Sequence, residues 1–133
     1  MTLARVLLAE DHRAVAEQLH ALLQTEFDVV AVVGDGHALL GAVQSLRPDV
    51  VVSDIAMPGL DGLAAATRIL GQNHAARIVL VSIHDEPALV QAAVDAGVLG
   101  YVCKSKAGEE LLPAVHAAMR GERHVPASSA PDG

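Results

Sequence analysis

The sequence predicts an α/β fold, with a parallel sheet that helices cover on both faces. Five short runs of β-branched and aliphatic residues recur along the chain, and they are Val6–Leu8, Val29–Val33, Val50–Val52, Ile78–Val81 and Tyr101–Val102. None of them alternates with polar residues, which indicates strands buried on both faces, as in parallel sheets. Helical patterns separate the runs, so we expect a strand followed by a helix five times.

The first two helices are predicted from apolar spacing. The first covers Arg13–Glu26, where apolar residues recur on one face and polar residues lie on the other. The second covers Ala38–Leu46 and stops ahead of Pro48, because a residue that precedes proline is disfavoured in a helix.

Caps define the third and fourth helices. The third begins after Asp61, an expected N-cap, and ends at Gly71. The fourth opens in the segment Asp85-Glu86-Pro87, since proline suits the first turn, and it closes at Gly97.

The fifth helix, over Gly108–Arg120, contains a conflict. Pro113 has no N–H group to pair with the carbonyl of Glu109. We therefore expect this helix either to start late, near Glu110, or to be kinked at the proline. Residues 122–133 change to a Pro/Ser/Ala composition, which is typical of a linker or a disordered segment.

Composition limits the class of protein. With 133 residues, 52% hydrophobic and 19% charged, the chain fits one folded domain. No apolar run approaches the roughly 18 residues that a membrane-spanning helix needs. We expect no export, because the first residues show neither a basic stretch nor a long apolar run, and the one cysteine, Cys103, is consistent with a cytoplasmic protein. The formal charge of −7 indicates that this segment does not bind DNA by itself.

Polar side chains suited to chemistry follow four of the predicted strands. Glu10 and Asp11 follow the first strand, Asp54 the third, Ser82 the fourth and Lys104 the fifth. Ligands of open α/β sheets bind at the carboxyl edge of the strands, so we expect these side chains to converge there.

This set of residues is suited to phosphoryl transfer. Three carboxylates about 5 Å apart repel pairwise by roughly 3 kcal/mol at an effective dielectric constant near 20, so they need a cation. Oxygen ligands without a thiolate select a hard ion such as Mg²⁺. Asp54 would then act as a carboxylate nucleophile that forms an acyl phosphate. Lys104 would neutralise the transferred group, and Ser82 would donate a hydrogen bond to it.

Four segments around these residues carry a family resemblance. They are Leu-Ala-Glu-Asp-His (8–12), Ser-Asp-Ile-Ala-Met-Pro-Gly-Leu-Asp-Gly (53–62), Val-Ser (81–82) and Gly-Tyr-Val-Cys-Lys (100–104). In this order they strongly resemble the receiver domain of two-component response regulators, over about residues 4–121. The resemblance implies a flavodoxin-like, doubly wound, five-stranded parallel sheet in the order 2-1-3-4-5, with five helices.

The resemblance also implies a role for each matching residue. Asp54 matches the phosphoacceptor, Ser82 the hydroxyl switch residue and Lys104 the lysine that contacts the phosphoryl group. Tyr101 matches the switch aromatic residue that turns inward on activation. Four groups match the Mg²⁺ ligands, and they are the carboxylates of Glu10, Asp11 and Asp54 and the backbone carbonyl of Ala56.

Three features look most similar to receivers of the NarL/FixJ group, namely the Lys104-Ser105 pair, residues 82–85 and residues 120–123. Such receivers usually precede a LuxR-type helix-turn-helix domain. We therefore expect a receiver domain over 1–121 and a linker or disordered segment over 122–133, with the output domain absent. The implied partners are a sensor histidine kinase, a second copy on phosphorylation, and DNA only through the missing domain.

Alternative functions remain open at this point. The chain is either a fragment of a transcription regulator or a stand-alone receiver that acts by protein contact. In both cases it is a switch that assists only its own phosphorylation and dephosphorylation. A phosphatase of the haloacid dehalogenase type would need an Asp-x-Asp motif after the first strand, where residues 8–12 do not supply one. A flavin module is disfavoured because Glu10 and Asp11 repel phosphate, and simple docking needs none of these residues.

Overall fold

The sheet is parallel throughout and has five strands. The computed structural model describes residues 3–84 and 86–126. Within that part of the chain the strands are β1 (Arg5–Ala9), β2 (Asp28–Val33), β3 (Val50–Asp54), β4 (Ile78–Ser82) and β5 (Gly100–Cys103). Their order in the sheet is β2-β1-β3-β4-β5, and every neighbouring pair is parallel. The flavodoxin-like arrangement expected from the sequence is confirmed.

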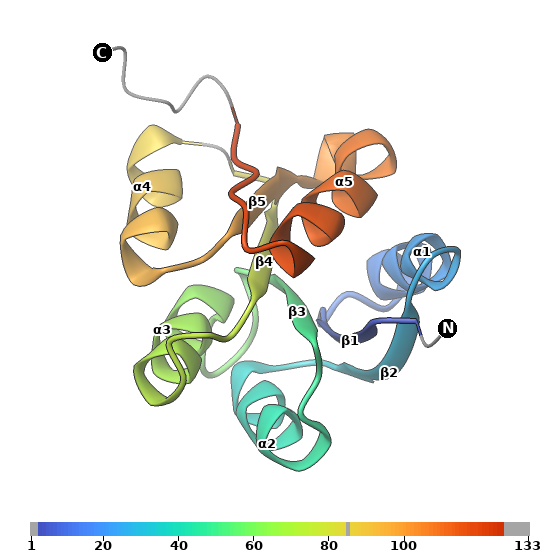
Figure 1. Ribbon diagram of the computed structural model, residues 1–133, viewed down its shortest axis with the longest axis horizontal. Coiled ribbons are helices and arrows are strands. Elements are labelled where there is room, and N and C mark those ends of the chain that lie inside the picture. Colours follow the sequence, from blue (N-terminus) through green and yellow to red (C-terminus); the bar gives the residue numbers. More distant parts are fainter. Residues whose placement is uncertain (1–2, 85, 127–133) are drawn as a thin grey trace.

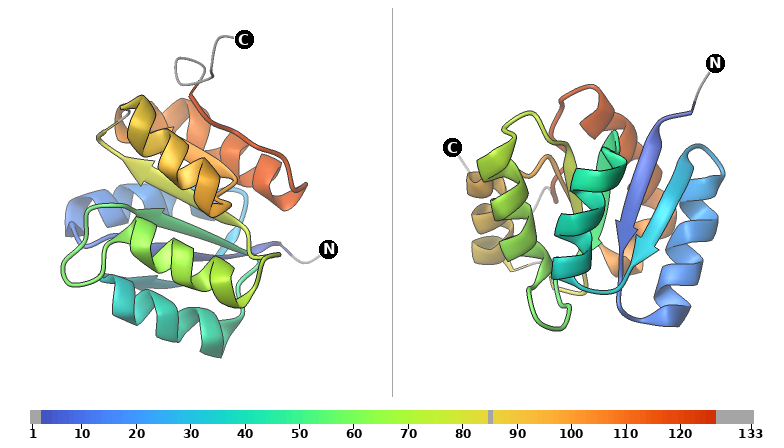
Figure 2. Two further views of the ribbon diagram at one scale, coloured as in Figure 1. Left: turned by 90° about the vertical axis from the view of Figure 1, so that its left-hand side faces the viewer. Right: turned by 90° about the horizontal axis from the view of Figure 1, so that it is seen from below.

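Helices cover both faces of this sheet. They are α1 (Arg13–Gln24), α2 (Gly36–Leu46), α3 (Gly62–Gln72), α4 (Pro87–Ala96) and α5 (Ala107–Met119), with a short 3₁₀ turn at Lys104–Lys106. Figure 1 shows α1 and α5 together on one side of the sheet, and α2, α3 and α4 on the other. The perpendicular views in Figure 2 show the same three layers.

Each face of the sheet has its own apolar core. Alternate residues of β1 point to opposite faces, so Leu8 packs with α1 and α5 while Leu7 packs with α2, α3 and α4. Every residue of β3 and β4 is buried, which explains why neither strand alternates with polar residues.

The strand order places the site. From β1 the chain crosses to the edge strand β2, and it then returns to β3 on the other side of β1. The carboxyl ends of β1 and β3 therefore lie side by side where the winding reverses, which is where open α/β sheets bind ligands. Ala9 pairs with Ser53, so Glu10 and Asp54 both leave the sheet at this edge.

Aspartate side chains cap the starts of α2 and α3. The Asp61 carboxylate accepts a hydrogen bond from the Ala64 N–H at 2.7 Å, which confirms the expected N-cap of α3. Asp35 caps α2 in the same way through Ala38, at 2.7 Å. The second helix consequently begins two residues before the predicted start at Ala38, because the cap fixes the first turn.

Of the two alternatives expected for the fifth helix, the late start is wrong, whereas a kink at Pro113 stays a prediction. Helix α5 begins at Ala107 and continues through Pro113, rather than starting near Glu110. Pro113 and Glu109 are both exposed, so the proline lies on the solvent side of the helix, where the loss of one helical hydrogen bond is tolerated. The first helix also ends at Gln24, two residues before the predicted end.

The last described residues contact the sheet. Helix α5 ends at Met119, and after the turn at Gly121 the chain runs back along β5, where His124 forms a parallel bridge with Gly100. The predicted linker over 122–133 therefore pairs with the sheet in its first part, and residues 127–133 lie outside the described residues. The domain boundary at residue 121 stays a prediction.

Among the described residues, no helix combines the length and the apolar character that a bilayer crossing requires.

Candidate functional site

The acidic pair after β1 is held by the backbone. The Glu10 N–H donates to the Val33 carbonyl at 2.9 Å, and one Glu10 carboxylate oxygen accepts from the His12 N–H at 3.1 Å. His12, rather than either acid, caps helix α1, because its ring Nδ1 accepts from the Val15 N–H. Glu10 and Asp11 are therefore not used in capping, and their carboxylates are available at the sheet edge.

Asp54 ends β3 and is 5% exposed. The loop that follows it closes tightly, because the Gly62 N–H donates to the Ile55 carbonyl at 2.7 Å. A Cβ atom at position 62 would overlap the backbone oxygen of Asp54. Only glycine permits this approach, and the start of α3 thereby fixes the backbone that carries the Asp54 carboxylate.

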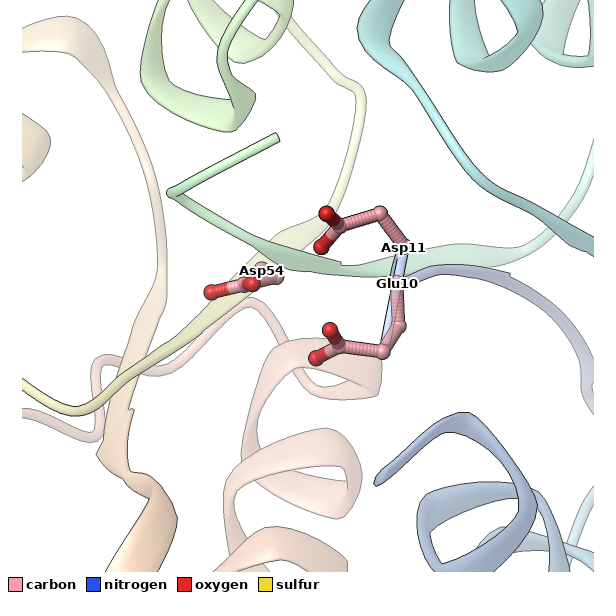
Figure 3. A group of neighbouring side chains, drawn as sticks. All are labelled: Glu10, Asp11 and Asp54. Atoms are coloured by element: carbon pink, nitrogen blue, oxygen red, sulfur yellow. The ribbon is translucent and has the colours of Figure 1, made fainter. Parts of the chain in front are cut away.

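Three carboxylates meet at the sheet edge. One oxygen from each of Glu10, Asp11 and Asp54 lies within 4.8 Å of the other two. Figure 3 shows the carboxylates of Glu10 and Asp11 on either side of Asp54. Glu10 and Asp54 are buried, whereas Asp11 is exposed, so the cluster opens to solvent on the side of Asp11.

Lys104 supplies the positive charge. Its ammonium Nζ lies 2.8 Å from Glu10 Oε1 and 3.1 Å from Asp54 Oδ2, and its side chain is 18% exposed. The residue begins the 3₁₀ turn that follows β5, two strands away from β3. The predicted convergence of residues 10, 11, 54 and 104 is thus what the structure shows.

The charges of the site influence one another. Burial raises the pKa of Glu10, and the Asp54 charge adds to this, while Lys104 and the His12 N–H oppose it. Burial lowers the pKa of Lys104, but its hydrogen bonds to Glu10 and Asp54 outweigh burial and leave that pKa above its usual value. One lysine faces three carboxylates, so a further cation would stabilise the ionised cluster.

Ser82 and Tyr101 belong to one hydrogen-bonded group. Ser82 ends β4 and is 2% exposed, and its hydroxyl oxygen accepts from the His84 N–H at 3.0 Å. The Tyr101 ring is fully buried, and its hydroxyl donates to the His84 carbonyl. The inward position that the resemblance assigns to an activated switch residue is therefore the position of Tyr101 here.

Two other residues complete the comparison with the sequence. Ala56 lies exposed in the loop after Asp54, and the role of its carbonyl stays a prediction. Gly62 had no predicted role, although the Asp61-Gly62 pair at a helix start was a visible signal for a close backbone approach. The partner of the Tyr101 hydroxyl had no sequence signal, because it is a backbone carbonyl.

Comparison with known proteins identifies the fold family. Residues 6–116 match the response regulator receiver domain. The chain belongs to this family. It is therefore a receiver domain of response regulators, which is a regulatory switch, and the family match favours this over the phosphatase, flavin and docking alternatives.

Several relatives are transcriptional regulators. The chain is 35% identical over 120 residues to the uncharacterised transcriptional regulatory protein YxjL of Bacillus subtilis, covering 89% of this chain and 55% of YxjL. It is 35% identical over 113 residues to the regulatory protein NarL of Mycobacterium tuberculosis, covering 84% and 52%. The receiver thus spans about half the length of these curated relatives.

Solved structures agree. A LuxR-family two-component response regulator from Aurantimonas has a TM-score of 0.90 and 32% identity to the chain, covering 96% of this chain and 93% of that one. The expected similarity to NarL- and LuxR-type receivers is confirmed by these relatives.

Proposed function

We propose that Asp54 accepts a phosphoryl group in a Mg²⁺-dependent reaction and that the new charge resets the adjacent loops. The observation that carries the proposal is the placement of the Lys104 ammonium between the carboxylates of Glu10 and Asp54. A nucleophile, a positive charge and an acidic cluster are brought to one sheet edge from three different strands, and a structural ion pair alone would not need the third carboxylate.

The residues present fit Mg²⁺. This ion binds oxygen at about 2.1 Å in an octahedron, so opposite ligands lie about 4.2 Å apart. One carboxylate oxygen from each of Glu10, Asp11 and Asp54 lies within 4.8 Å of the other two, so the three residues bring hard oxygen ligands to one point. Together with the Ala56 carbonyl these groups would hold the ion. When bound, Mg²⁺ would supply charge neutralisation beside the transferred phosphoryl oxygens.

The residues of the chain account for the rest of the reaction. An Asp54 carboxylate oxygen attacks phosphorus, a P–O bond forms, and the P–N bond of the donor phosphohistidine breaks. The electron pair of the P–N bond stays on the donor imidazole, which takes a proton from solvent. Lys104 is already hydrogen bonded beside Asp54 and would stabilise the charge on the transferred group. Ser82, at the end of the next strand, would donate its hydroxyl to a phosphoryl oxygen.

The consequence of phosphorylation would be a shift of the loop after β4. A phosphoryl group adds about −1.5 to −2 charge at neutral pH. Attraction of the Ser82 hydroxyl toward that charge would draw the loop after β4 toward the site, and so favour the arrangement in which the Tyr101 hydroxyl donates to the His84 carbonyl. This gives the domain two states that differ at the surface around α4 and β5.

The relatives suggest the setting of this switch. YxjL and NarL are transcriptional regulators about twice as long as the matched segment. By analogy, this chain would act in the cytoplasm, where a sensor histidine kinase would donate the phosphoryl group and a C-terminal DNA-binding domain of the longer protein would respond to it. One similar solved structure contains two RcsB dimers bound to two parallel DNAs, and by analogy a homodimer would be the output form of this protein.

The test is the intact mass of the protein after incubation with acetyl phosphate and Mg²⁺. We expect one added phosphoryl group in the wild type, none in Asp54→Ala, and none when Mg²⁺ is removed by a chelator. The matched control is Asp61→Asn, in the same loop, which retains a capping side chain and should be phosphorylated normally. An unchanged wild-type mass, or added phosphate in Asp54→Ala, would contradict the proposal.

A further inference from the structure

We propose that residues 122–126 form a strap whose docking on β5 is coupled, through Tyr101, to the state of the loop after β4. The strap begins after the turn at Gly121 and ends at Pro126. Figure 1 shows it passing between α4 and α5, alongside β5. The coupling to phosphorylation rests on the function proposed for Asp54, whereas the docking of the strap does not.

A helix-stop motif aims the strap at the sheet. Gly121 has a φ of +73°, its N–H donates to the Ala118 carbonyl, and the Glu122 N–H donates to the Ala117 carbonyl at 2.8 Å. This pair of bonds is the Schellman arrangement that ends many helices. It reverses the chain direction, so the residues after Gly121 run parallel to β5 instead of away from the domain.

Two backbone hydrogen bonds then dock the strap on the free edge of β5. The His124 N–H donates to the Leu99 carbonyl at 2.9 Å, and the Tyr101 N–H donates to the His124 carbonyl at 2.9 Å. β5 is an edge strand of the sheet, and the strap satisfies polar groups that the edge would otherwise expose. The two donors alternate between strap and strand, as in an added parallel strand.

Side chains anchor both sides of the strap. Val125 is partly buried and packs against the core cluster that contains Tyr101 and residues of α4. The His124 ring Nε2 lies 3.6 Å from the Glu110 carboxylate of α5. The strap is thus held against the two helices that flank β5, and not only by the edge of the strand.

Tyr101 connects the strap to the loop after β4. Its backbone N–H bonds to the strap, its ring belongs to the cluster that Val125 covers, and its hydroxyl donates to the His84 carbonyl. The His84 N–H in turn donates to the Ser82 hydroxyl oxygen at 3.0 Å. A continuous set of hydrogen bonds therefore joins Ser82, at the phosphorylation edge, to the segment that leads out of the domain.

This arrangement couples the docking of the strap to the conformation of the loop after β4. The docked strap covers the cluster that holds the Tyr101 ring inward, and the inward ring holds the loop that carries the Ser82 contact. A phosphoryl group that favours this loop arrangement would therefore favour strap docking. By thermodynamic reciprocity, a docked strap would favour the phosphoryl-bound state by the same factor.

The chain provides its own reporter for the first half of the proposal. Tyr101 is the one tyrosine, and the sequence has no tryptophan, so intrinsic fluorescence reports this ring alone. Acrylamide quenching should be weak in the wild type, because the ring is fully buried. In His124→Pro, which removes the N–H that bonds to Leu99, we expect quenching to rise at least about twofold, because the region opens locally.

Two further variants make this result decisive. Val125→Ala keeps the backbone hydrogen bonds of the strap and removes apolar contact, so its acrylamide quenching should lie between that of the wild type and that of His124→Pro. Circular dichroism shows whether His124→Pro is folded. If it is not, Val125→Ala alone provides the test. Arg123→Gln, at an exposed strap position, is the matched control and should quench like the wild type. Wild-type quenching in folded His124→Pro, or in Val125→Ala if the proline variant unfolds, would overturn the docking role of the strap.

The second half is tested with beryllofluoride and Mg²⁺ as a stable phosphoryl mimic. Coupling free energies between two sites are typically 1–3 kcal/mol. The beryllofluoride concentration that gives half-saturation should therefore rise about fivefold or more in His124→Pro. If that variant is unfolded, the rise is measured in Val125→Ala. It should be unchanged in Arg123→Gln. Equal values in all proteins would overturn the coupling. If the wild type neither binds beryllofluoride nor is labelled by acetyl phosphate, the function proposed for Asp54 is wrong. The acrylamide quenching of the variants still tests whether the strap docks on β5.

Discussion

The loops that follow β3 and β4 leave the same edge of the sheet but are held in different ways. The loop after β3 is fixed by backbone contact, since the Gly62 N–H bonds to the Ile55 carbonyl and Met57 is only 8% exposed. The loop after β4 depends on two hydroxyl groups, those of Ser82 and Tyr101, which both bond to His84. Ile83, in that loop, is 69% exposed.

The two loops are suited to different functions. A nucleophile needs a fixed position, because small displacements of reacting groups are costly. A reporter of charge needs an arrangement that a few hydrogen bonds can change, and hydroxyl contacts with little apolar burial provide that. We therefore infer that the loop after β3 positions the chemistry and that the loop after β4 reports it.

The largest effect is expected where the first loop has no free space. Gly62→Ala should lower the free energy of unfolding by about 3 kcal/mol, because the new methyl group overlaps the Asp54 backbone and forces it to shift. The matched control is Gly71→Ala in the same helix, where a Cβ atom would meet nothing within 4 Å. This substitution should raise the free energy of unfolding by about 0.5–1 kcal/mol. Urea denaturation measures both, and equal effects would show that the loop after β3 is not rigid.

A pair of alanine substitutions compares the two loops directly. Met57→Ala should cost about 2 kcal/mol of unfolding free energy, since it removes a buried side chain. Ile83→Ala should change it by less than about 0.5 kcal/mol, since that side chain faces solvent. Thermal or urea unfolding of both variants provides the test, and a cost at Ile83 as large as that at Met57 would contradict the comparison.

Removal of the lysine sharpens the description of the fixed region. Lys104→Met should tighten Mg²⁺ binding about tenfold, because the ammonium group no longer repels the ion from the Glu10 and Asp54 carboxylates. Labelling by acetyl phosphate should become slower in the same variant, because the transferred charge loses its partner. Calorimetry of Mg²⁺ binding and intact mass measure the two effects. Unchanged Mg²⁺ affinity would show that Lys104 does not compete with the ion.

Ser82→Ala should separate the phosphorylation of Asp54 from the response of the loop after β4. Ser82→Ala removes the oxygen that accepts from the His84 N–H and should cost about 1 kcal/mol of unfolding free energy. Asp54 should still take up a phosphoryl group, because its loop is untouched. The His84 amide resonance, followed by NMR, should no longer respond to phosphorylation. A full response of that resonance in Ser82→Ala would exclude Ser82 from the switch.

The sequence was most informative where burial and strand ends decide the structure. Five unalternated apolar runs predicted the parallel sheet, and the polar residues that follow four strands predicted the site, because parallel strands share one carboxyl edge. Glu10, Asp11, Asp54 and Lys104 meet there as expected. The strand order itself came from family resemblance, since apolar periodicity does not determine which strands are neighbours.

Other features depend on contacts that no local pattern reveals. Pro113 argued for a late start or a kink, but the helix runs from Ala107 through the proline, which lies on the exposed side. Residues 122–126 have the composition of a linker, yet they pair with β5 because the turn at Gly121 directs them to a free strand edge. The hydroxyl partner of Tyr101 is a backbone carbonyl, which could not be chosen by residue type.

The most direct test of the division between the two loops is amide hydrogen exchange, measured on the wild type and Asp54→Ala with and without acetyl phosphate and Mg²⁺. In the wild type, exchange at His84 and Tyr101 should change on phosphorylation, while exchange at Ile55 and Gly62 should stay the same. In Asp54→Ala no site should change. A similar response of both loops in the phosphorylated wild type, or a His84 response in Asp54→Ala, would contradict the account.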